Sequence, residues 1–545
     1  AAARAEAWRT AGELRLVRAD TAGAADAFRR TIQAAPGTAA ALAAARQLTT
    51  LPGLTVEDHL RIGRLYLRHG NLDRGIAGLS AYLDAGAGTA AERTRIRLDL
   101  AQALFNAGRY DDAVPRLLRL VEDSPSERIA GDALYLAARA QYRQGEVERA
   151  KATLRRVADR FPRQDAGTKA MYLFADLEHD AGNLPLARQF YRRAVDAGSD
   201  IEEAGLALMR LAGMALVDGD YRAALDIFEA YRARYPNGRR YQQATYWAAR
   251  AFHELGNEEQ MGQRLRETWR HDPLSFYGVL AGEQLGLSPV DTHLEPSPQP
   301  PPSVQADVAR ALLRLDLLRE LGDNGAAELE VGRIDEHFSD ADGAIYLVAE
   351  ALNERGFTFS GIGLGWDIQR REGAWNPRLL RIIYPLPFRE FIVAESQERG
   401  LDPWLVAGLI RQESMFSAAV TSPAGAIGLM QIMPNTGRAL ARGAALEPFE
   451  ISMLEQPEVN IHLGTRYFAE LLGRYDGRIT AVLAAYNAGP HRVAAWRKFP
   501  EWRDEELFGE RIPFAETRDY VRKVRGNAAI YRALYGADGT GPDNR

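Results

Sequence analysis

A glycine that recurs about every 37 residues is the feature that most constrains the fold of this chain. The recurring glycines are Gly70, Gly108, Gly145, Gly182, Gly219 and Gly256, at spacings of 38, 37, 37, 37 and 37 residues. Most of them are followed five positions later by a small residue, namely Gly75, Ala113, Ala150, Ala187 and Ala224. Glycine permits a tight turn between antiparallel helices, and a small residue lets the second helix approach the first. The repeat therefore predicts a solenoid of stacked helical hairpins.

The stretches between these glycines carry helical patterns, for example at residues 98–105 and 113–120. The array resembles tetratricopeptide repeats, with a period slightly longer than the usual ~34 residues. Residues 5–36 are interpreted as a divergent leading unit, with Ala19 and Ala24 in the places of the turn residue and the small residue. We therefore expect a mainly α protein that begins with a helical superhelix.

The chain has 545 residues, more than one hydrophobic core usually covers, so we expect several domains. A proline-rich stretch interrupts the helical pattern and predicts an extended linker. Beyond it the pattern indicates two more helical hairpins, and we interpret Gly361–Gly365 as a turn between helices rather than a phosphate loop. The predicted segments are a helical superhelix at 1–287, a linker at 288–303, a helical linker domain at 304–383, a catalytic domain at 384–535 and a disordered tail at 536–545.

Composition excludes several classes of protein. The net charge of −5 argues against a nucleic-acid binder, and no apolar run approaches the ~18 residues of a membrane span. The absence of cysteine excludes disulfides, thiol catalysis and cysteine-based zinc sites. The nine histidines show no metal-ligand spacing, so we expect no metal and no cofactor. The N-terminus shows neither an initiator methionine nor the apolar core of a signal peptide, as expected of a mature, trimmed or engineered chain.

The first candidate site residue is Glu413, in the sequence Arg411-Gln412-Glu413-Ser414. Asp402 and Pro403 suit the start of a helix, and the following apolar run places the Glu413 carboxyl on the buried face. Burial disfavours the charged form of a carboxyl and raises its pKa, which suits a general acid near neutral pH. The alternative is a structural glutamate that pairs with an arginine or turns to solvent.

The stretch Ser422–Pro434 is unusually rich in glycine, alanine and methionine. Gly425 and Gly428 allow positive φ and let backbone approach a ligand closely. Met430, Gln431 and Met433 add soft apolar groups and one amide, a mixture that suits a sugar-binding floor. The alternative is a tight turn packed under a helix.

Two later stretches complete the set. Residues 481–490 predict a helix that ends at Gly489 and presents Tyr486 on one face. Residues 512–521 begin the last helix, with Glu516 in or near its first turn. Taken alone, each of these side chains is more often structural than functional.

Together these stretches resemble the soluble lytic transglycosylases, over residues 384–535. The motifs that carry the resemblance are Arg-Gln-Glu-Ser, Gly-Ala-Ile-Gly-Leu-Met-Gln-Ile-Met-Pro, Ala-Tyr-Asn-Ala-Gly-Pro and Glu-Thr-Arg-x-Tyr-Val. The resemblance implies a goose-lysozyme-like, mostly helical catalytic domain on a superhelix that closes into a ring or a curved horseshoe. The regular repeats here keep a straighter solenoid open as the alternative.

The resemblance also implies function. It implies cleavage of the β-1,4 bond between N-acetylmuramic acid and N-acetylglucosamine in peptidoglycan, with a 1,6-anhydro product and a role in cell-wall turnover. The implied place of action is the periplasm or cell envelope, and the implied partners are glycan strands, with cell-wall proteins as further candidates through the array. The implied catalytic residues are Glu413, as acid and then base, and Tyr486, which orients or stabilises charge near the substrate acetamide. The implied substrate-binding residues are Ser422, Gly428, Gln431, Met433, Asn487, Ala488, Glu516 and Tyr520.

Two other interpretations remain open from the residues themselves. A goose-type hydrolase could use the same fold with water in place of the muramoyl C6 hydroxyl. A non-catalytic cell-wall scaffold built on the solenoid is the second. The product formed and the effect of Glu413→Gln on turnover distinguish a lytic transglycosylase, a hydrolase and a non-catalytic scaffold.

Overall fold

The computed structural model describes residues 1–123, 127–290, 300–338 and 343–536. This part of the chain is helical and contains no β-strand, only isolated bridges that join Thr421 to Ile427 and Ile427 to Ile432. The prediction of a mainly α protein is confirmed. None of its helices is both long enough and apolar enough to span a bilayer.

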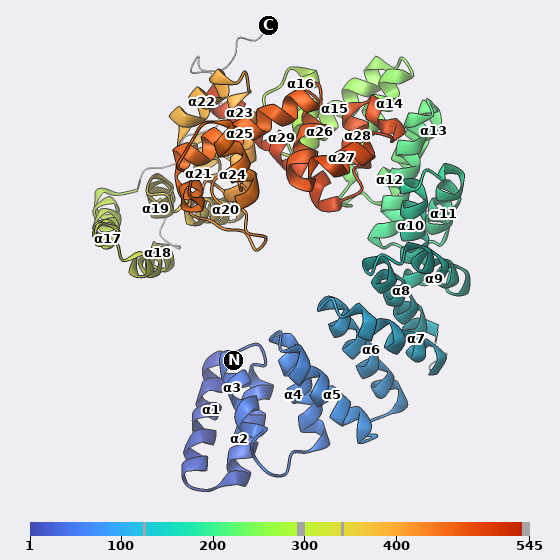
Figure 1. Cartoon of the computed structure of the whole chain (residues 1–545), viewed down its shortest axis with the longest axis vertical. Coiled ribbons are helices and arrows are strands. Elements are labelled where there is room, and N and C mark those ends of the chain that lie inside the picture. The colour runs from blue at the N-terminus through green and yellow to red at the C-terminus, as the bar shows by residue number, and fades with distance from the viewer. Residues whose placement is uncertain (124–126, 291–299, 339–342, 537–545) are drawn as a thin grey trace. The chain divides into compact units, whose positions relative to one another are not determined.

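The chain divides into two compact units, residues 1–211 and 212–545. The helices of the first unit are α1 (Ala2–Val17), α2 (Thr21–Ala34), α3 (Ala39–Leu48), α4 (Val56–Arg68), α5 (Leu72–Asp84), α6 (Ala90–Asn106), α7 (Tyr110–Asp123), α8 (Glu127–Arg143), α9 (Val147–Arg160), α10 (Asp165–Asp180), α11 (Leu184–Asp196) and the greater part of α12 (Glu202–Val217) (Figure 1).

The second unit continues the hairpins and then carries the candidate site. Its helices are α13 (Tyr221–Arg234), α14 (Tyr241–Glu254), α15 (Glu258–His271), α16 (Phe276–Leu285), α17 (Pro302–Glu320), α18 (Asn324–Phe338), α19 (Ala344–Glu354), α20 (Thr358–Glu372), α21 (Pro377–Ile383), α22 (Arg389–Glu398), α23 (Pro403–Ser414), α24 (Pro434–Gly443), η1 (Ile451–Glu455), α25 (Pro457–Arg474), α26 (Ile479–Ala488), α27 (Pro490–Trp496), η2 (Pro500–Arg503), α28 (Glu505–Arg511) and α29 (Ala515–Tyr535).

The repeated glycines form the turns between hairpin helices, as predicted. All six adopt left-handed backbone with φ between 73° and 86°, a region that side chains disfavour. Five residues on, Ala113 and its equivalents are fully buried, and a Cβ added to Gly75 would lie 2.3 Å from a methyl group of Leu67. In the leading unit Ala19 takes the turn conformation with φ of 59°, and Ala24 is buried. The predicted turns and small residues of the repeats are confirmed, and so are the corresponding positions of the leading unit.

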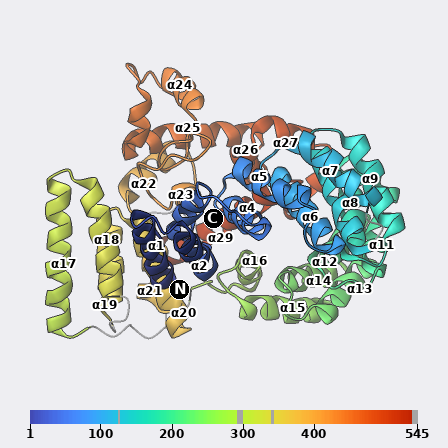
Figure 2. The same cartoon turned by 90° about the horizontal axis from the view of Figure 1, so that it is seen from below.

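Four helices after the predicted linker form two more hairpins, α17 with α18 and α19 with α20 (Figure 2). The interpretation of Gly361–Gly365 as a turn is wrong, because these residues lie inside α20 and the turn falls at Gly356. The glycines serve close helix packing instead. A Cβ on Gly361 would lie 2.7 Å from the Ala349 carbonyl oxygen, and one on Gly365 would lie 2.7 Å from Ile383.

One hydrophobic core extends through α17–α29 and joins the predicted linker helices to the site helices. Leu380 and Ile383 of α21 belong to the same cluster as Val406 and Ile410 of α23. The proposed domain boundaries remain predictions. Residues 291–299 of the predicted linker and 537–545 of the predicted tail lie outside the described residues.

Helices α14 and α16 contact α28 through a polar cluster around Glu510. The Glu510 carboxylate accepts hydrogen bonds from Tyr277 and Gln243 and pairs with Arg522 of α29. Burial raises the pKa of Glu510, but the charge of Arg522 and the hydrogen bonds outweigh it, so the pKa lies below its usual value. The ionised carboxylate therefore ties the last repeat helices to the end of the chain.

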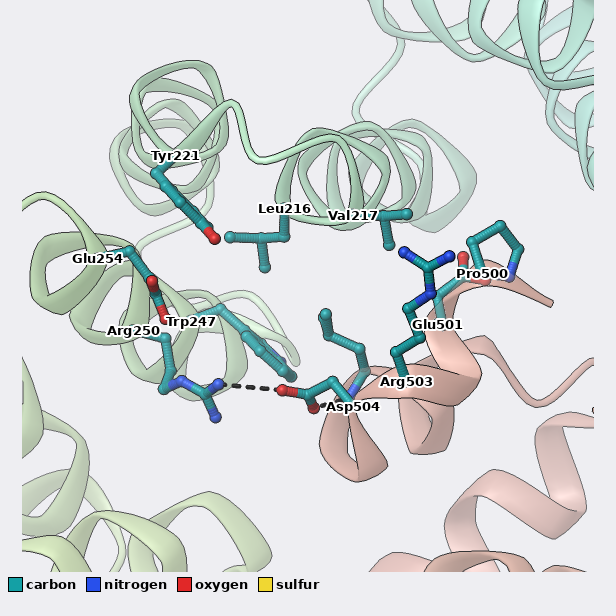
Figure 3. A pocket seen from close by; sticks show the side chains of 11 residues that line it. Leu216, Val217, Tyr221, Trp247, Arg250, Glu254, Pro500, Glu501, Arg503 and Asp504 are labelled. Carbon is teal, nitrogen blue, oxygen red and sulfur yellow. Dashed lines mark hydrogen bonds and ion pairs between the residues drawn. The ribbon is translucent and has the colours of Figure 1, made fainter.

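A pocket of about 200 Å³ lies beside this contact, between α12–α14 and the η2–α28 segment (Figure 3). Arg250 spans it and donates to Asp504 Oδ2 over 3.1 Å. Trp247 forms part of the wall, and its indole N–H donates to Glu510. The seam between the repeat helices and α28 is thus held by charged and aromatic groups.

Tyr277→Phe tests this contact. The substitution removes one hydrogen bond to the Glu510 carboxylate from a side chain that is 8% exposed. Such a bond contributes about 1.5–3 kcal/mol, so we expect the free energy of unfolding of the second unit to fall by about 2 kcal/mol. Chemical denaturation measures it, and Tyr142→Phe, at an exposed tyrosine, is the control and should change little. An unchanged midpoint in Tyr277→Phe would contradict the assigned role.

Candidate active site

Glu413 lies in the last turn of α23, a helix that is almost entirely buried. Asp402 caps its N-terminus by accepting from the Trp404 N–H over 3.0 Å, and Pro403 occupies the first turn, as predicted. The helix ends at Ser414 and is capped by Met415, which has φ of 49°. Its apolar face packs into the core, so the Glu413 carboxyl at its end is only partly accessible to water.

Burial raises the pKa of Glu413 to about 7. The Tyr520 hydroxyl donates to Glu413 Oε1 over 2.6 Å, which lowers the pKa, but burial is the larger effect. The predicted shift is therefore confirmed in direction. At neutral pH a large fraction of this carboxyl is protonated, as a general acid requires.

The loop that follows α23 folds back on itself through side chains named from the sequence. The Ser422 Oγ accepts from the Ala426 N–H over 2.9 Å, and the Gln431 amide donates to the carbonyl oxygens of Gly428 and Val420. Gly425 and Gly428 have φ of 87° and 79°, which fits the predicted need for glycine. These bonds and backbone angles close the loop on itself.

Asn460 of α25 holds this loop to the core, and sequence reasoning missed it. Its buried side chain donates to the carbonyl oxygens of Ile427 and Leu454 and accepts from the Met430 N–H over 2.7 Å. Ser414 adds a bond from its hydroxyl to the Leu429 carbonyl oxygen over 2.8 Å. The only signal for Asn460 in the sequence is a single amide within an otherwise apolar helix face.

Tyr486 lies on α26 and its hydroxyl donates to the Met430 carbonyl oxygen over 2.7 Å. Burial raises its pKa well above the usual value, and the Glu413 charge adds to the shift, so the two side chains lie close to one another. Tyr467 of α25 packs beside it, with ring centroids 5.4 Å apart. Sequence reasoning missed Tyr467, since no motif surrounds it.

The remaining predicted residues lie around this group. Met433, at the N-terminus of α24, is 43% exposed, and Asn487 accepts from the Thr517 hydroxyl over 2.7 Å. Ala488 ends α26, where it is partly buried. Glu516 is exposed in the first turn of α29, one helical turn before Tyr520.

The structure thus brings some predicted residues into direct contact and leaves others apart. Glu413 contacts Tyr520, and Tyr486 bonds to the loop. For Glu516, no hydrogen bond or ion pair occurs within the described parts of the chain. Gly428, a residue of this loop, is buried against Leu454 and Asn460 and does not lie at the surface.

These features define a class of protein: a helical repeat chain that carries a site built around one part-buried glutamate, Glu413. Residues 390–508 match the transglycosylase SLT domain, and tetratricopeptide repeat models match at 60–128, 98–165, 135–200 and 205–238. Helix α29, which supplies Tyr520 to Glu413, lies beyond the matched part of the SLT domain.

Two relatives with similar sequences carry the name soluble lytic murein transglycosylase. The chain is 35% identical over 155 residues to the soluble lytic murein transglycosylase of Salmonella typhimurium, which is 28% of this chain and 24% of the relative. It is 27% identical over 343 residues to the Escherichia coli K12 protein of the same name, 61% of this chain and 50% of the relative. The matches therefore span at most half the length of these two relatives.

Solved structures share the fold. The lytic transglycosylase Slt of Pseudomonas aeruginosa superposes with a TM-score of 0.64 at 21% identity, over 98% of this chain and 83% of that one. The 70-kDa soluble lytic transglycosylase, solved in complex with bulgecin A, gives 0.66 at 19% identity, over 95% and 90%. The chain is therefore similar in part of its sequence to soluble lytic murein transglycosylases, and it shares the fold of the two solved structures.

Proposed function

We propose that this chain is a lytic transglycosylase that cleaves the β-1,4 bond between N-acetylmuramic acid and N-acetylglucosamine in the peptidoglycan of the bacterial cell envelope. The observation that carries the proposal is the Glu413 carboxyl, part-buried and with a pKa of about 7. The SLT domain match and the relatives named soluble lytic murein transglycosylases support the substrate class.

Glu413 acts first as an acid and then as a base. Because Oε1 accepts from Tyr520, the carboxyl proton resides on Oε2, free to be given to the glycosidic oxygen. The bond between muramoyl C1 and that oxygen breaks, and the leaving sugar keeps the proton. The ionised Glu413 then takes the proton of the muramoyl C6 hydroxyl, whose oxygen bonds to C1 and forms the 1,6-anhydro ring.

Among the described residues no other carboxylate contributes to the pKa of Glu413, which favours a substrate-assisted route. Within the described residues, burial and the Tyr520 hydroxyl are the influences on its pKa, whereas a neighbouring carboxylate would raise it further by repulsion. Glycosidases with two catalytic carboxyls place them within about 10 Å of each other. The positive charge at C1 is therefore assigned to the substrate's own acetamide oxygen.

Tyr486 fits the role of orienting that acetamide. Its hydroxyl hydrogen is used by the Met430 carbonyl oxygen, so the phenol oxygen is left as an acceptor for the acetamide N–H. The high pKa of the phenol keeps it neutral at every working pH. Ser422, Gln431, Met433 and Asn487 are proposed to contact the sugars on either side.

Mass spectrometry of muropeptides released from purified peptidoglycan tests the proposal. Products lighter than reducing muropeptides by one water molecule are expected. Reducing-end products would mean a hydrolase of the goose-lysozyme type, and the C6-hydroxyl step would be wrong. If nothing is released, the enzymatic proposal fails and a scaffold function for the array gains weight.

Tyr520→Phe tests the acid directly. In the wild type, the hydrogen bond from the Tyr520 hydroxyl lowers the pKa of Glu413. Its loss in Tyr520→Phe should therefore raise the pKa of Glu413 above about 7. The basic limb of the pH–activity profile, where the acid form is lost, is then expected to move to higher pH. Tyr535→Phe, on the same helix but bonded to the Tyr384 carbonyl oxygen, is the matched control. A shift of the limb to lower pH in Tyr520→Phe would refute the assignment.

A further inference from the structure

The first unit contains a groove of about 780 Å³ that the candidate active site does not use. The groove is formed by the end of α3, the following loop and the facing sides of α4 and α5. Its volume lies within the range of about 300–1,000 Å³ that is typical of ligand sites. The groove lies wholly within one compact unit.

Small residues keep the floor of the groove low. Helices α4 and α5 meet at Gly63 and Gly78, where a Cβ on Gly78 would lie 2.7 Å from the Gly63 Cα. Ala77 and Ala81 continue the same face of α5. Because these side chains are short, space remains above them, and this space forms part of the groove.

The polar groups of the groove are cationic or neutral. Arg46, Arg74 and His59 line it, and no aspartate or glutamate is among the described residues that do. Neither arginine belongs to an ion pair within the described parts of the chain, although the chain as a whole carries a net charge of −5. The groove is therefore a local cationic site on an acidic protein.

Arg74 is held in a defined orientation. Its guanidinium lies 5.4 Å from the centroid of the Tyr66 ring, and Nη1 donates to the Tyr66 hydroxyl over 3.3 Å. The contact leaves most of its N–H donors available, in the planar fork that pairs with carboxylates. Arg74 also lies in the first turn of α5, where the helix dipole adds partial positive charge.

We propose that this groove binds an acidic, extended segment of another protein. Carboxylates of that segment pair with Arg46 and Arg74, and an apolar side chain between them enters the space above Ala77 and Ala81. A sugar ring fits less well, because the Tyr66 ring is only 2% exposed and offers no face for stacking. The proposal goes beyond the enzymatic function and does not depend on it.

Fluorescence anisotropy with the full chain tests the proposal. The probe is a labelled peptide, Ala-Glu-Glu-Leu-Ala-Glu with a free carboxyl terminus, beside a matched peptide with glutamine for glutamate and an amidated terminus. We expect only the acidic peptide to bind, and to bind about tenfold more weakly to Arg74→Gln and to Arg46→Gln. Raising the salt concentration to about 0.5 M should also weaken binding of the acidic peptide to the wild type.

The controls separate this site from a general charge effect. Arg61→Gln removes the same charge from an exposed position on α4 outside the groove and should bind the peptide like the wild type. Release of muropeptides should be unchanged in Arg74→Gln, so a failure here leaves the enzymatic proposal standing. Equal binding of both peptides, no binding of the acidic peptide, or an equal loss in Arg61→Gln would each overturn the proposal. So would binding of a soluble muropeptide, but not of the acidic peptide, that depends on Arg74.

Discussion

Glu413→Gln is expected to reduce the release of anhydromuropeptides from peptidoglycan by at least about a thousandfold. A positioned general acid contributes roughly 10²–10⁴-fold to a rate, and here one side chain serves both proton transfers. Glutamine is nearly isosteric and still accepts the Tyr520 hydrogen bond, but it has no proton to give to the glycosidic oxygen. Initial rates of product formation, followed by mass spectrometry, measure the effect.

The fold of the Glu413→Gln variant is expected to be intact. Burial raises the pKa of Glu413 to about 7 from a usual value near 4.5, so the folded state holds a proton that the unfolded state releases between these values. The stability linked to that proton is fully present below pH 4.5 and is lost as the pH rises through 7. The glutamine variant should therefore be at least as stable as the wild type at pH 8. Full activity in this variant would refute the role of Glu413.

Gly428→Ala is expected to lower the free energy of unfolding of the site domain by about 3 kcal/mol. A Cβ here would lie 2.2 Å from the Leu454 carbonyl oxygen and 2.3 Å from the Asn460 amide nitrogen, both buried. Left-handed backbone costs alanine roughly 1–2 kcal/mol, and overpacking adds about 1–3 kcal/mol. Because Asn460 holds the loop, activity should fall as well. Urea denaturation and muropeptide release measure the two effects.

Gly425→Ala is the matched control for Gly428→Ala. Gly425 has an equally positive φ of 87° in the same loop, but a Cβ there would meet no atom within 4 Å. We expect only the backbone cost, about 1 kcal/mol, and a smaller loss of activity. Equal destabilisation by the two substitutions would show that backbone strain alone explains the effect and that the packing at Gly428 is unimportant.

The local features of this protein were predictable because they depend on neighbouring residues. The turns at Gly70 and its equivalents follow from glycine's freedom at positive φ, and the hairpins follow from helical patterning between them. The same holds for the start of α23 at Asp402 and for the buried face that raises the pKa of Glu413. Each of these statements concerns residues within a few helical turns.

The error at Gly361–Gly365 shows the limit of local rules. Glycines permit a turn, but they also permit close helix packing, and the choice depends on Ala349 and Ile383 across the interface. The sequence contains both signals and does not rank them.

The arrangement of the site was decided by tertiary structure. The Tyr520 hydroxyl reaches Glu413 from 107 residues away along the chain, and Asn460 holds a loop 30 residues before it. Tyr467 and the Glu510 cluster likewise depend on helices that meet only after folding. The sequence by itself determined the repeat helices, the turns at Gly70 and its equivalents and the buried position of Glu413, since these are local properties. Which phenol contacts that glutamate, and which amide holds its loop, depends on the packing of α23, α25 and α29 into one core.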